Sequence, residues 1–178
     1  PFHTWLPEAH AYAPHPVSAI LSGVLIKVSF FALVRIVIVF QALYLMTPFM
    51  WIGGITATAA VIWALSQHDA KRLLAYHSIS QMGYVLAAFG ALSSLSLSAA
   101  FLHAGNHALF KSLLFLAVGT AITLTGERDL FRMPRIGSRA PVLSIALVIG
   151  AASIAGIPPF NGFVSKQIVT TALQESIT

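Results

Sequence analysis

Apolar residues recur along this chain in stretches long enough to cross a membrane, separated by short polar segments. A spanning helix needs about 20 predominantly apolar residues at a rise of ~1.5 Å each. The pattern predicts spans at 16–40, 48–66, 73–92 and 96–124, and an interrupted span at 141–174. Residues 1–15 are too short and too rich in proline to span, so we expect a half helix and a loop there. The predicted fold class is all-α, a polytopic transmembrane helix bundle of about five spans plus a half helix.

A break is predicted in the middle of the last stretch, near residues 157–162. Gly156, Pro158, Pro159 and Gly162 interrupt an otherwise apolar run there, and two adjacent prolines break a helix rather than bend it. Unwound backbone at bilayer depth is tolerated only where it is buried in protein or lines a wet cavity. Such discontinuous helices mark ion sites in secondary transporters. The alternative is an ordinary interfacial loop that joins two short helices.

Composition excludes an ordinary soluble domain. Hydrophobic residues make up 57% of the chain and charged residues 8%, against ~45–50% and ~25% in soluble domains. The absence of cysteine excludes disulfides, thiolate metal sites and Cys-ligated iron–sulfur clusters within the chain. Because the sequence starts without a Met, a basic leader or a cleavage signal, we expect an interior piece of a longer protein.

Basic residues gather on one side of the predicted bundle. If the spans alternate in direction, segments 1–15, 67–72 and 125–140 share a side, and 41–47 and 93–95 share the other. The first side carries Lys71, Arg72, Arg128, Arg132, Arg135 and Arg139, and the loops of the second side carry no Lys or Arg. The positive-inside rule therefore makes 67–72 and 125–140 cytoplasmic, in a cell membrane. A nucleic-acid or lipid-headgroup patch is the alternative, but topology needs fewer assumptions, so no nucleic acid is expected as a partner.

Three lysines lie within apolar, helix-length segments, with no Asp or Glu near them in sequence: Lys27, Lys111 and Lys166. A charge at bilayer depth costs at least ~2.5–3.5 kcal/mol, so each is a functional-site hypothesis. Lys166 falls in the first turn of the second half helix, where the positive end of the macrodipole disfavours a cation.

The 96–124 span has the most specific pattern. His103, His107 and Lys111 are spaced i, i+4 and i+8, so they share one helix face. Histidine titrates near physiological pH, and two imidazoles and an amine could pass protons along this face. A metal site is not expected, because the two histidines lack a suitable third ligand. His77, in the polar turn YHSISQMG, is either a relay or helix-packing glue.

Four ordered motifs resemble one known family. They are PFHTWLPEAHAYAPHPVSAILSGVLIKV, HDAKRLLAYHSISQMGYV, LHAGNHALFKSLLFLAVG and SIAGIPPFNGFVSK. They resemble the antiporter-like, proton-translocating membrane subunits shared by respiratory complex I (NADH-quinone oxidoreductase), energy-converting membrane-bound hydrogenases and multisubunit cation/proton antiporters. The resemblance covers nearly the whole chain and implies an inverted-repeat fold with broken helices. The chain would run from the second half of the seventh span through the twelfth.

The resemblance also implies residue roles. Lys27 matches the eighth-span lysine that links the two half-channels. His103, His107 and Lys111 match the relay of the eleventh span, and Lys166 matches the twelfth-span lysine that exchanges protons with the far side. The glutamate and lysine of the first half-channel would lie before Pro1. The loop GERDLFRMPRIGSRAP departs mildly from the family pattern, which leaves the subfamily open.

The resulting hypothesis is a non-redox subunit that moves protons, with Na+ as an alternative ion, across the membrane within a redox-driven complex. Other membrane subunits and the lipid bilayer are its expected partners, and no cofactor is expected in this chain. A multisubunit Na+/H+ antiporter is the alternative complex. A passive membrane scaffold is the alternative of another class, in which the lysines would pair with unseen acids.

Overall fold

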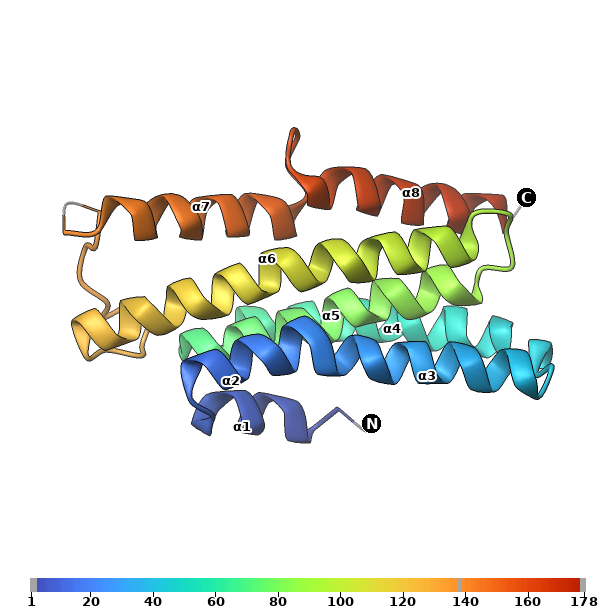
Figure 1. The fold of residues 1–178 in the computed structure, drawn as a ribbon, viewed down its shortest axis with the longest axis horizontal. Coiled ribbons are helices and arrows are strands. Elements are labelled where there is room, and N and C mark those ends of the chain that lie inside the picture. Colours follow the sequence, from blue (N-terminus) through green and yellow to red (C-terminus); the bar gives the residue numbers. More distant parts are fainter. Residues whose placement is uncertain (1–2, 138, 177–178) are drawn as a thin grey trace.

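The computed structural model describes residues 3–137 and 139–176, and nearly all of them are helical (Figure 1). Within this part of the chain, the only β-type pairing is an isolated bridge between Asp69 and Asp129. The all-α prediction is therefore confirmed. Residues 1 and 2 of the predicted half helix and residue 138 of the predicted cytoplasmic loop lie outside the described residues.

Eight α-helices follow one another along the described chain. They are α1 (Trp5–Tyr12), α2 (His15–Ile20), α3 (Ile26–Val39), α4 (Met46–Leu65), α5 (Ala70–Gly90), α6 (Ser96–Thr125), α7 (Pro141–Ala155) and α8 (Asn161–Glu175). A π-helical turn, Leu21–Leu25, joins α2 to α3, so the three segments form one continuous rod (Figure 1).

Local sequence explains where several helices begin and end. Pro141 stands in the first turn of α7, where its missing N–H costs nothing. The carboxylate of Asp69 accepts from the backbone N–H groups of Lys71 and Arg72, at 2.8 and 3.0 Å, and so caps α5. Gly126 and Gly156 end α6 and α7 in the left-handed conformation, with φ of 72° and 81°.

Three segments of the described chain are long and apolar enough to cross a membrane: His15–Val39, Leu43–Leu65 and Ser96–Thr125. Apolar side chains on the outer surface of α4, such as Trp51 and Ile55, are largely exposed, as expected for a lipid-facing helix. Helix α5 is of comparable length, but it is not apolar enough to be counted among these candidate spans. It packs against α1, α4, α6 and α8, so its polar side chains are surrounded by protein.

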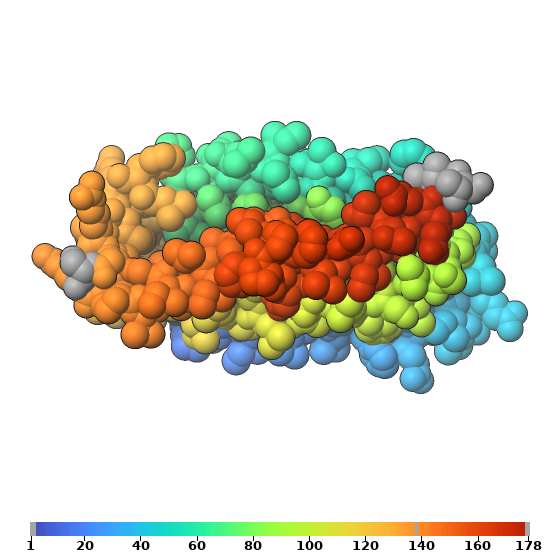
Figure 2. All heavy atoms as spheres, turned by 90° about the horizontal axis from the view of Figure 1, so that it is seen from above, coloured from blue at the N-terminus to red at the C-terminus, as the bar shows by residue number. Residues whose placement is uncertain are grey.

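The predicted helix break is confirmed. Helices α7 and α8 lie end to end along α6 (Figure 1), and they cross one face of the molecule (Figure 2). The unwound segment is 156–160, and α8 begins at Asn161. Gly162, expected in the break, lies inside α8 instead. A Cβ on Gly162 would come within 1.7 Å of the Ser153 carbonyl oxygen, so this glycine allows α8 to start directly against α7.

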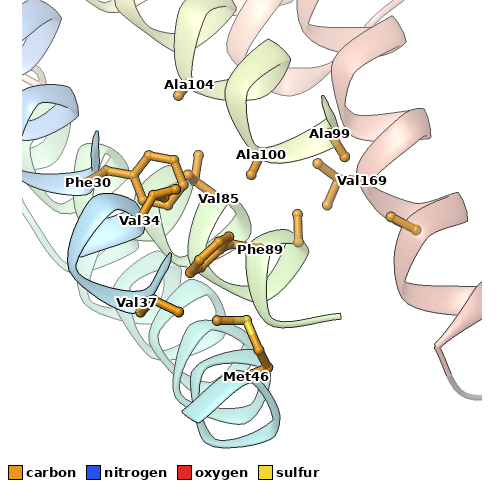
Figure 3. Packing of buried hydrophobic residues seen from close by; sticks show 12 residues of the cluster. Phe30, Val34, Val37, Met46, Val85, Phe89, Ala99, Ala100, Ala104 and Val169 are labelled. Atoms are coloured by element: carbon orange, nitrogen blue, oxygen red, sulfur yellow. The ribbon is translucent and has the colours of Figure 1, made fainter. Parts of the chain in front are cut away.

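Buried apolar residues of the described chain form three clusters, two of which lie toward opposite ends of the bundle. The larger cluster joins α3, α4, α5, α6 and α8 near the ends of α3 and α5 (Figure 3). Its labelled members are Phe30, Val34, Val37, Met46, Val85, Phe89, Ala99, Ala100, Ala104 and Val169. The second lies near the start of α5 and includes Leu74, Phe115 and Ile122. Along α5 and α6, the buried side chains of Ser78, Ser80, Gln81, His103, His107 and Lys111 fall between these two clusters.

The two loops predicted to be cytoplasmic meet at one end of the bundle. The backbone N–H of Ala70 donates to the Arg128 carbonyl at 3.1 Å, and that of Leu130 donates to the His68 carbonyl at 3.0 Å. The Arg128 guanidinium also pairs with Asp69 at 3.3 Å. Residues 67–72 and 127–130 therefore share a side, as the alternation of the spans requires.

Candidate functional site

Lys111 lies at the centre of the candidate site. Its side chain is 0% exposed, and its Nζ donates to the Leu74 carbonyl of α5 at 2.6 Å. The ammonium also lies 5.7 Å from the ring centroid of Phe115, one turn further along α6. Within residues 3–137 and 139–176, no acidic side chain pairs with it. The contacts of this buried amine are thus a backbone carbonyl and an aromatic ring.

Hydrogen bonds to Ser22, Ser78 and Leu74 connect the surroundings of Lys27 with those of Lys111. Its Nζ donates to the carbonyl of Ser22, in the π-helical turn. The hydroxyls of Ser22 and Ser78 lie 2.8 Å apart, and the Ser78 hydroxyl donates to the Leu74 carbonyl at 3.1 Å. That same carbonyl accepts from Lys111. Two serines of different helices therefore bridge the two lysines.

The bridging serines lie deeper in the site than sequence reasoning suggested. The sequence pattern did not single out Ser22, and it placed Ser78 only within the polar turn YHSISQMG. The π-helical turn packs closely at this point, since a Cβ on neighbouring Gly23 would lie 2.2 Å from the Ser112 hydroxyl of α6. Sequence could not have paired them, because their contact joins the π-helical turn to α5 across 56 residues.

His103 connects three helices. Its Nδ1 lies 3.0 Å from the Ser165 hydroxyl of α8, and its Nε2 lies 3.1 Å from Oε1 of Gln81 on α5. Its side chain is 0% exposed. Ser165 immediately precedes Lys166, so His103 joins the α6 face to the second half of the broken helix.

His107 lies one turn from both His103 and Lys111, as the spacing predicts. It is 0% exposed, yet neither ring nitrogen has a hydrogen-bond partner within the described chain. Buried polar groups without a protein partner are usually satisfied by water. This imidazole is therefore suited to a water-linked step between its two neighbours.

Lys166 reaches the end of the other half helix. Its Nζ donates to the carbonyls of Ile154 and Ala155 at 2.6 and 3.3 Å. The expectation that the positive end of α8 dominates at this amine needs correction. The long side chain carries the ammonium to the carboxyl end of α7, where the macrodipole favours a cation.

The break itself is held by residues that the sequence did not single out. Asn106 of α6 donates from Nδ2 to the Asn161 carbonyl at 3.1 Å, which fixes the start of α8. Pro158 and Pro159 are exposed, and Gly156 faces the Lys166 side chain. His77 is half-buried and makes no hydrogen bond with the described residues, so it lies outside the hydrogen-bonded series. In the same part of the chain, no cluster of three His, Asp or Glu side chains could hold a metal ion.

A family model matches nearly the whole chain. The model described as "NADH:quinone oxidoreductase/Mrp antiporter, TM" matches residues 1–177. The chain belongs to this family. Its members include subunits of different complexes, so membership alone leaves open which complex this chain serves.

Curated relatives come from three kinds of complex. Formate hydrogenlyase subunit 3 of Escherichia coli is 35% identical over 95% of this chain and 30% of its own length. One of the Na(+)/H(+) antiporter subunits of Alkalihalophilus pseudofirmus is 34% identical, over 93% of this chain and 34% of its own length. An NADH-quinone oxidoreductase subunit of Desulforudis audaxviator is 37% identical over 93% and 34% of the two lengths. The chain thus spans about a third of these relatives.

Solved structures of family complexes have the same fold. A chain of the archaeal membrane-bound sulfane sulfur reductase superimposes with a TM-score of 0.88 at 28% identity, over 99% of this chain and 39% of that one. A chain of the Mrp complex from Dietzia sp. gives a TM-score of 0.80 at 34% identity, over 99% and 20%. The antiporter-like fold inferred from the motifs is confirmed.

Proposed function

We propose that this chain carries part of a proton path in a membrane subunit that translocates protons, powered by partner subunits of a larger complex. The observation that carries the proposal is the close series of polar groups from Lys27 through the Ser22 and Ser78 hydroxyls to Lys111, in which each lysine amine donates to a backbone carbonyl beside these hydroxyls. The His107 and His103 face extends that series toward Ser165 and Lys166. No cofactor is assigned to this chain.

Charge alternation along the lysines would drive the movement. Desolvation disfavours the charged form of a buried amine, and a second cation nearby disfavours it further. A proton on Lys27 therefore weakens the hold of Lys111 on its own proton. Serine hydroxyls can donate and accept at once, which suits Ser22 and Ser78 to the step between the lysines. Water would complete the step at each end, because the Ser22 and Leu74 carbonyls that meet the two amines can only accept. His107 and His103 would then carry the proton toward Lys166.

A passive scaffold accounts less well for these lysines. In a scaffold they would be paired with acids, but each hydrogen-bonds to backbone carbonyls: Lys27 to Ser22, Lys111 to Leu74 and Lys166 to Ile154 and Ala155. Lys111 is 0% exposed within this chain, so an acid of another subunit could not reach its amine without rearrangement. Retaining an unpaired buried amine is costly, which favours a functional reason for it.

The same groups suit two kinds of complex. The proposal places the chain in a redox-driven complex of the complex I or membrane-bound hydrogenase type, with the basic loops 67–72 and 125–140 facing the cytoplasm. A multisubunit Na+/H+ antiporter is the alternative, supported by the relatives that are subunits of such antiporters. Ser22 and Ser78 offer hydroxyl oxygens, so Na+ as the moved ion is part of that alternative.

Removing a lysine amine tests the proposal. In vesicles containing the complete complex, Lys111→Met or Lys166→Met should lower proton pumping by roughly an order of magnitude or more, at matched subunit levels. Lys111→Arg should also impair pumping, because guanidinium stays charged at any workable pH. Arg35→Met is the control, because Arg35 is exposed near the end of α3. Wild-type pumping by both Met variants would support the scaffold instead.

A further inference from the structure

His10 is a buried histidine that the proposed path does not use. It lies in α1, its side chain is 0% exposed, and neither ring nitrogen has a hydrogen-bond partner within the described residues. Its backbone carbonyl is fixed, because the Ser18 hydroxyl of α2 donates to it at 3.3 Å. A buried imidazole without a protein hydrogen-bond partner ordinarily hydrogen-bonds to buried water. Of the described histidines, only His10 and His107 have both nitrogens in this state.

One aromatic ring separates His10 from Lys111. The His10 ring stacks on Phe115 with a centroid separation of 4.5 Å and an interplanar angle of 18°. The Lys111 ammonium lies 5.7 Å from the centroid of the same Phe115 ring. His10 is thus the titratable group of α1 that approaches the central lysine, on the side away from His107.

A polar pocket begins at the residue that follows His10. Its lining includes Ala11, Tyr12, Gln67, His68, Asp69 and Arg128. These residues come from the end of α1 and from the two loops that meet at the basic end of the bundle. The pocket therefore offers a wet surface on the predicted cytoplasmic side, one residue away from an enclosed imidazole.

Cations surround this end of α1. Lys71 of α5 donates from Nζ to the Ala13 carbonyl at 2.6 Å, and Arg128 donates to the Ala11 carbonyl. Lys111 faces His10 from α6. The nearby carboxylates are already engaged, since Glu8 pairs with Arg72 at 3.0 Å and Asp69 pairs with Arg128 at 3.3 Å. Lys71 and Arg128 would repel a proton on His10, so the proton would move on to Lys111 whenever the Lys111 amine is neutral.

We propose that His10 passes protons between the polar pocket at the loop end and Lys111, with water bridging the imidazole to both. The inference rests on the proposed function and extends its path to one surface of the bundle. His10 accepts a proton on one ring nitrogen and releases the proton that the other ring nitrogen carries. The imidazole is therefore neutral again after each transfer. Phe115 orients the ring and excludes a direct contact with the amine.

Isosteric substitutions at position 10 separate proton carriage from packing. His10→Gln introduces a polar side chain that cannot titrate. His10→Glu introduces a side chain of the same size as Gln that can titrate. In vesicles of the complete complex at matched subunit levels, His10→Gln should reduce proton pumping several-fold. His10→Glu should recover part of that loss and shift the pH dependence of pumping. His3→Gln, a histidine just before α1, is the control and should pump as wild type.

The outcomes distinguish this inference from the function on which it rests. Normal pumping by His10→Gln, in a complex where Lys111→Met is defective, would overturn the role of His10 alone. Equal losses in His10→Gln and His10→Glu would also overturn it, since they would reveal a packing role. Normal pumping by Lys111→Met would instead remove the proposed function itself.

Discussion

At the residue scale, the site depends on small residues that let larger polar ones reach their partners. Gly156 is the sharpest case, because it meets two requirements at once. Its φ of 81° lies in the left-handed region that side chains disfavour, and a Cβ there would come within 3.0 Å of the Lys166 side chain. The contact between the Lys166 amine and the end of α7 therefore depends on glycine at this position.

Replacing Gly156 should cost stability and displace Lys166. We expect Gly156→Ala to destabilise the fold by ~1–2 kcal/mol through backbone strain alone, and to lower pumping as Lys166 shifts. Gly105→Ala, at a helical position with open space around its would-be Cβ, should be neutral or slightly stabilising. The midpoint temperature of thermal unfolding, measured on the assembled complex, compares the two variants. Equal midpoint temperatures for Gly156→Ala and Gly105→Ala would contradict the strain argument.

At the element scale, α4 and α5 approach so closely that their backbones touch through glycines. A Cβ on Gly53 would lie 2.4 Å from the backbone nitrogen of Ala87, and a Cβ on Gly83 would lie 2.6 Å from that of Ala57. Small residues at such contacts are the usual basis of helix association in membranes. This packing holds α5 with its polar face turned to α6.

Adjacent glycines of α4 provide a matched test. Gly53 is buried against α5, whereas Gly54 has nothing within 4 Å of its would-be Cβ. Gly53→Val should push the helices apart at a cost of ~1–3 kcal/mol and reduce the amount of assembled subunit in membranes. Gly54→Val adds the same side chain facing outward and should leave assembly unchanged. Comparable assembly of both variants would rule out the close contact.

At the scale of the whole molecule, the basic end and the opposite end differ in charge and in packing. Loops 67–72 and 127–130 are tied together by backbone hydrogen bonds and by the Arg128–Asp69 pair. The connection at 41–45 lies at the other end, beside the larger apolar cluster (Figures 1 and 3). The polar groups of the proposed path lie between these two ends.

Labelling from one side tests the orientation. The chain has no cysteine of its own, so single cysteines can be introduced into it. Cysteines within 67–72 and 130–139 should react with an impermeant thiol reagent from the cytoplasm, and those within 41–47 only from outside. Opposite accessibility of 67–72 and 130–139 would contradict the predicted alternation of the spans.

The sequence by itself determined the helical class, the break and the main polar face. Apolar stretches of helix length can bury their backbone only as helices in a bilayer, so the class follows from composition and pattern. Adjacent prolines place a break wherever they occur, and i, i+4 spacing aligns His103, His107 and Lys111 whatever the surroundings. The family motifs also indicated which of the family's spans this chain contains, namely the second half of the seventh through the twelfth.

The tertiary structure decided which groups touch. Ser22 of the π-helical turn meets Ser78 of α5 across 56 residues of sequence, and such contacts between distant segments have no local signal. The Lys166 side chain spans the break and hydrogen-bonds to the carboxyl end of α7. This contact reversed the expectation that the positive end of the α8 macrodipole disfavours the ammonium. In the sequence His10 is an ordinary histidine of a short helix, and only packing encloses it against Phe115, beside Lys111.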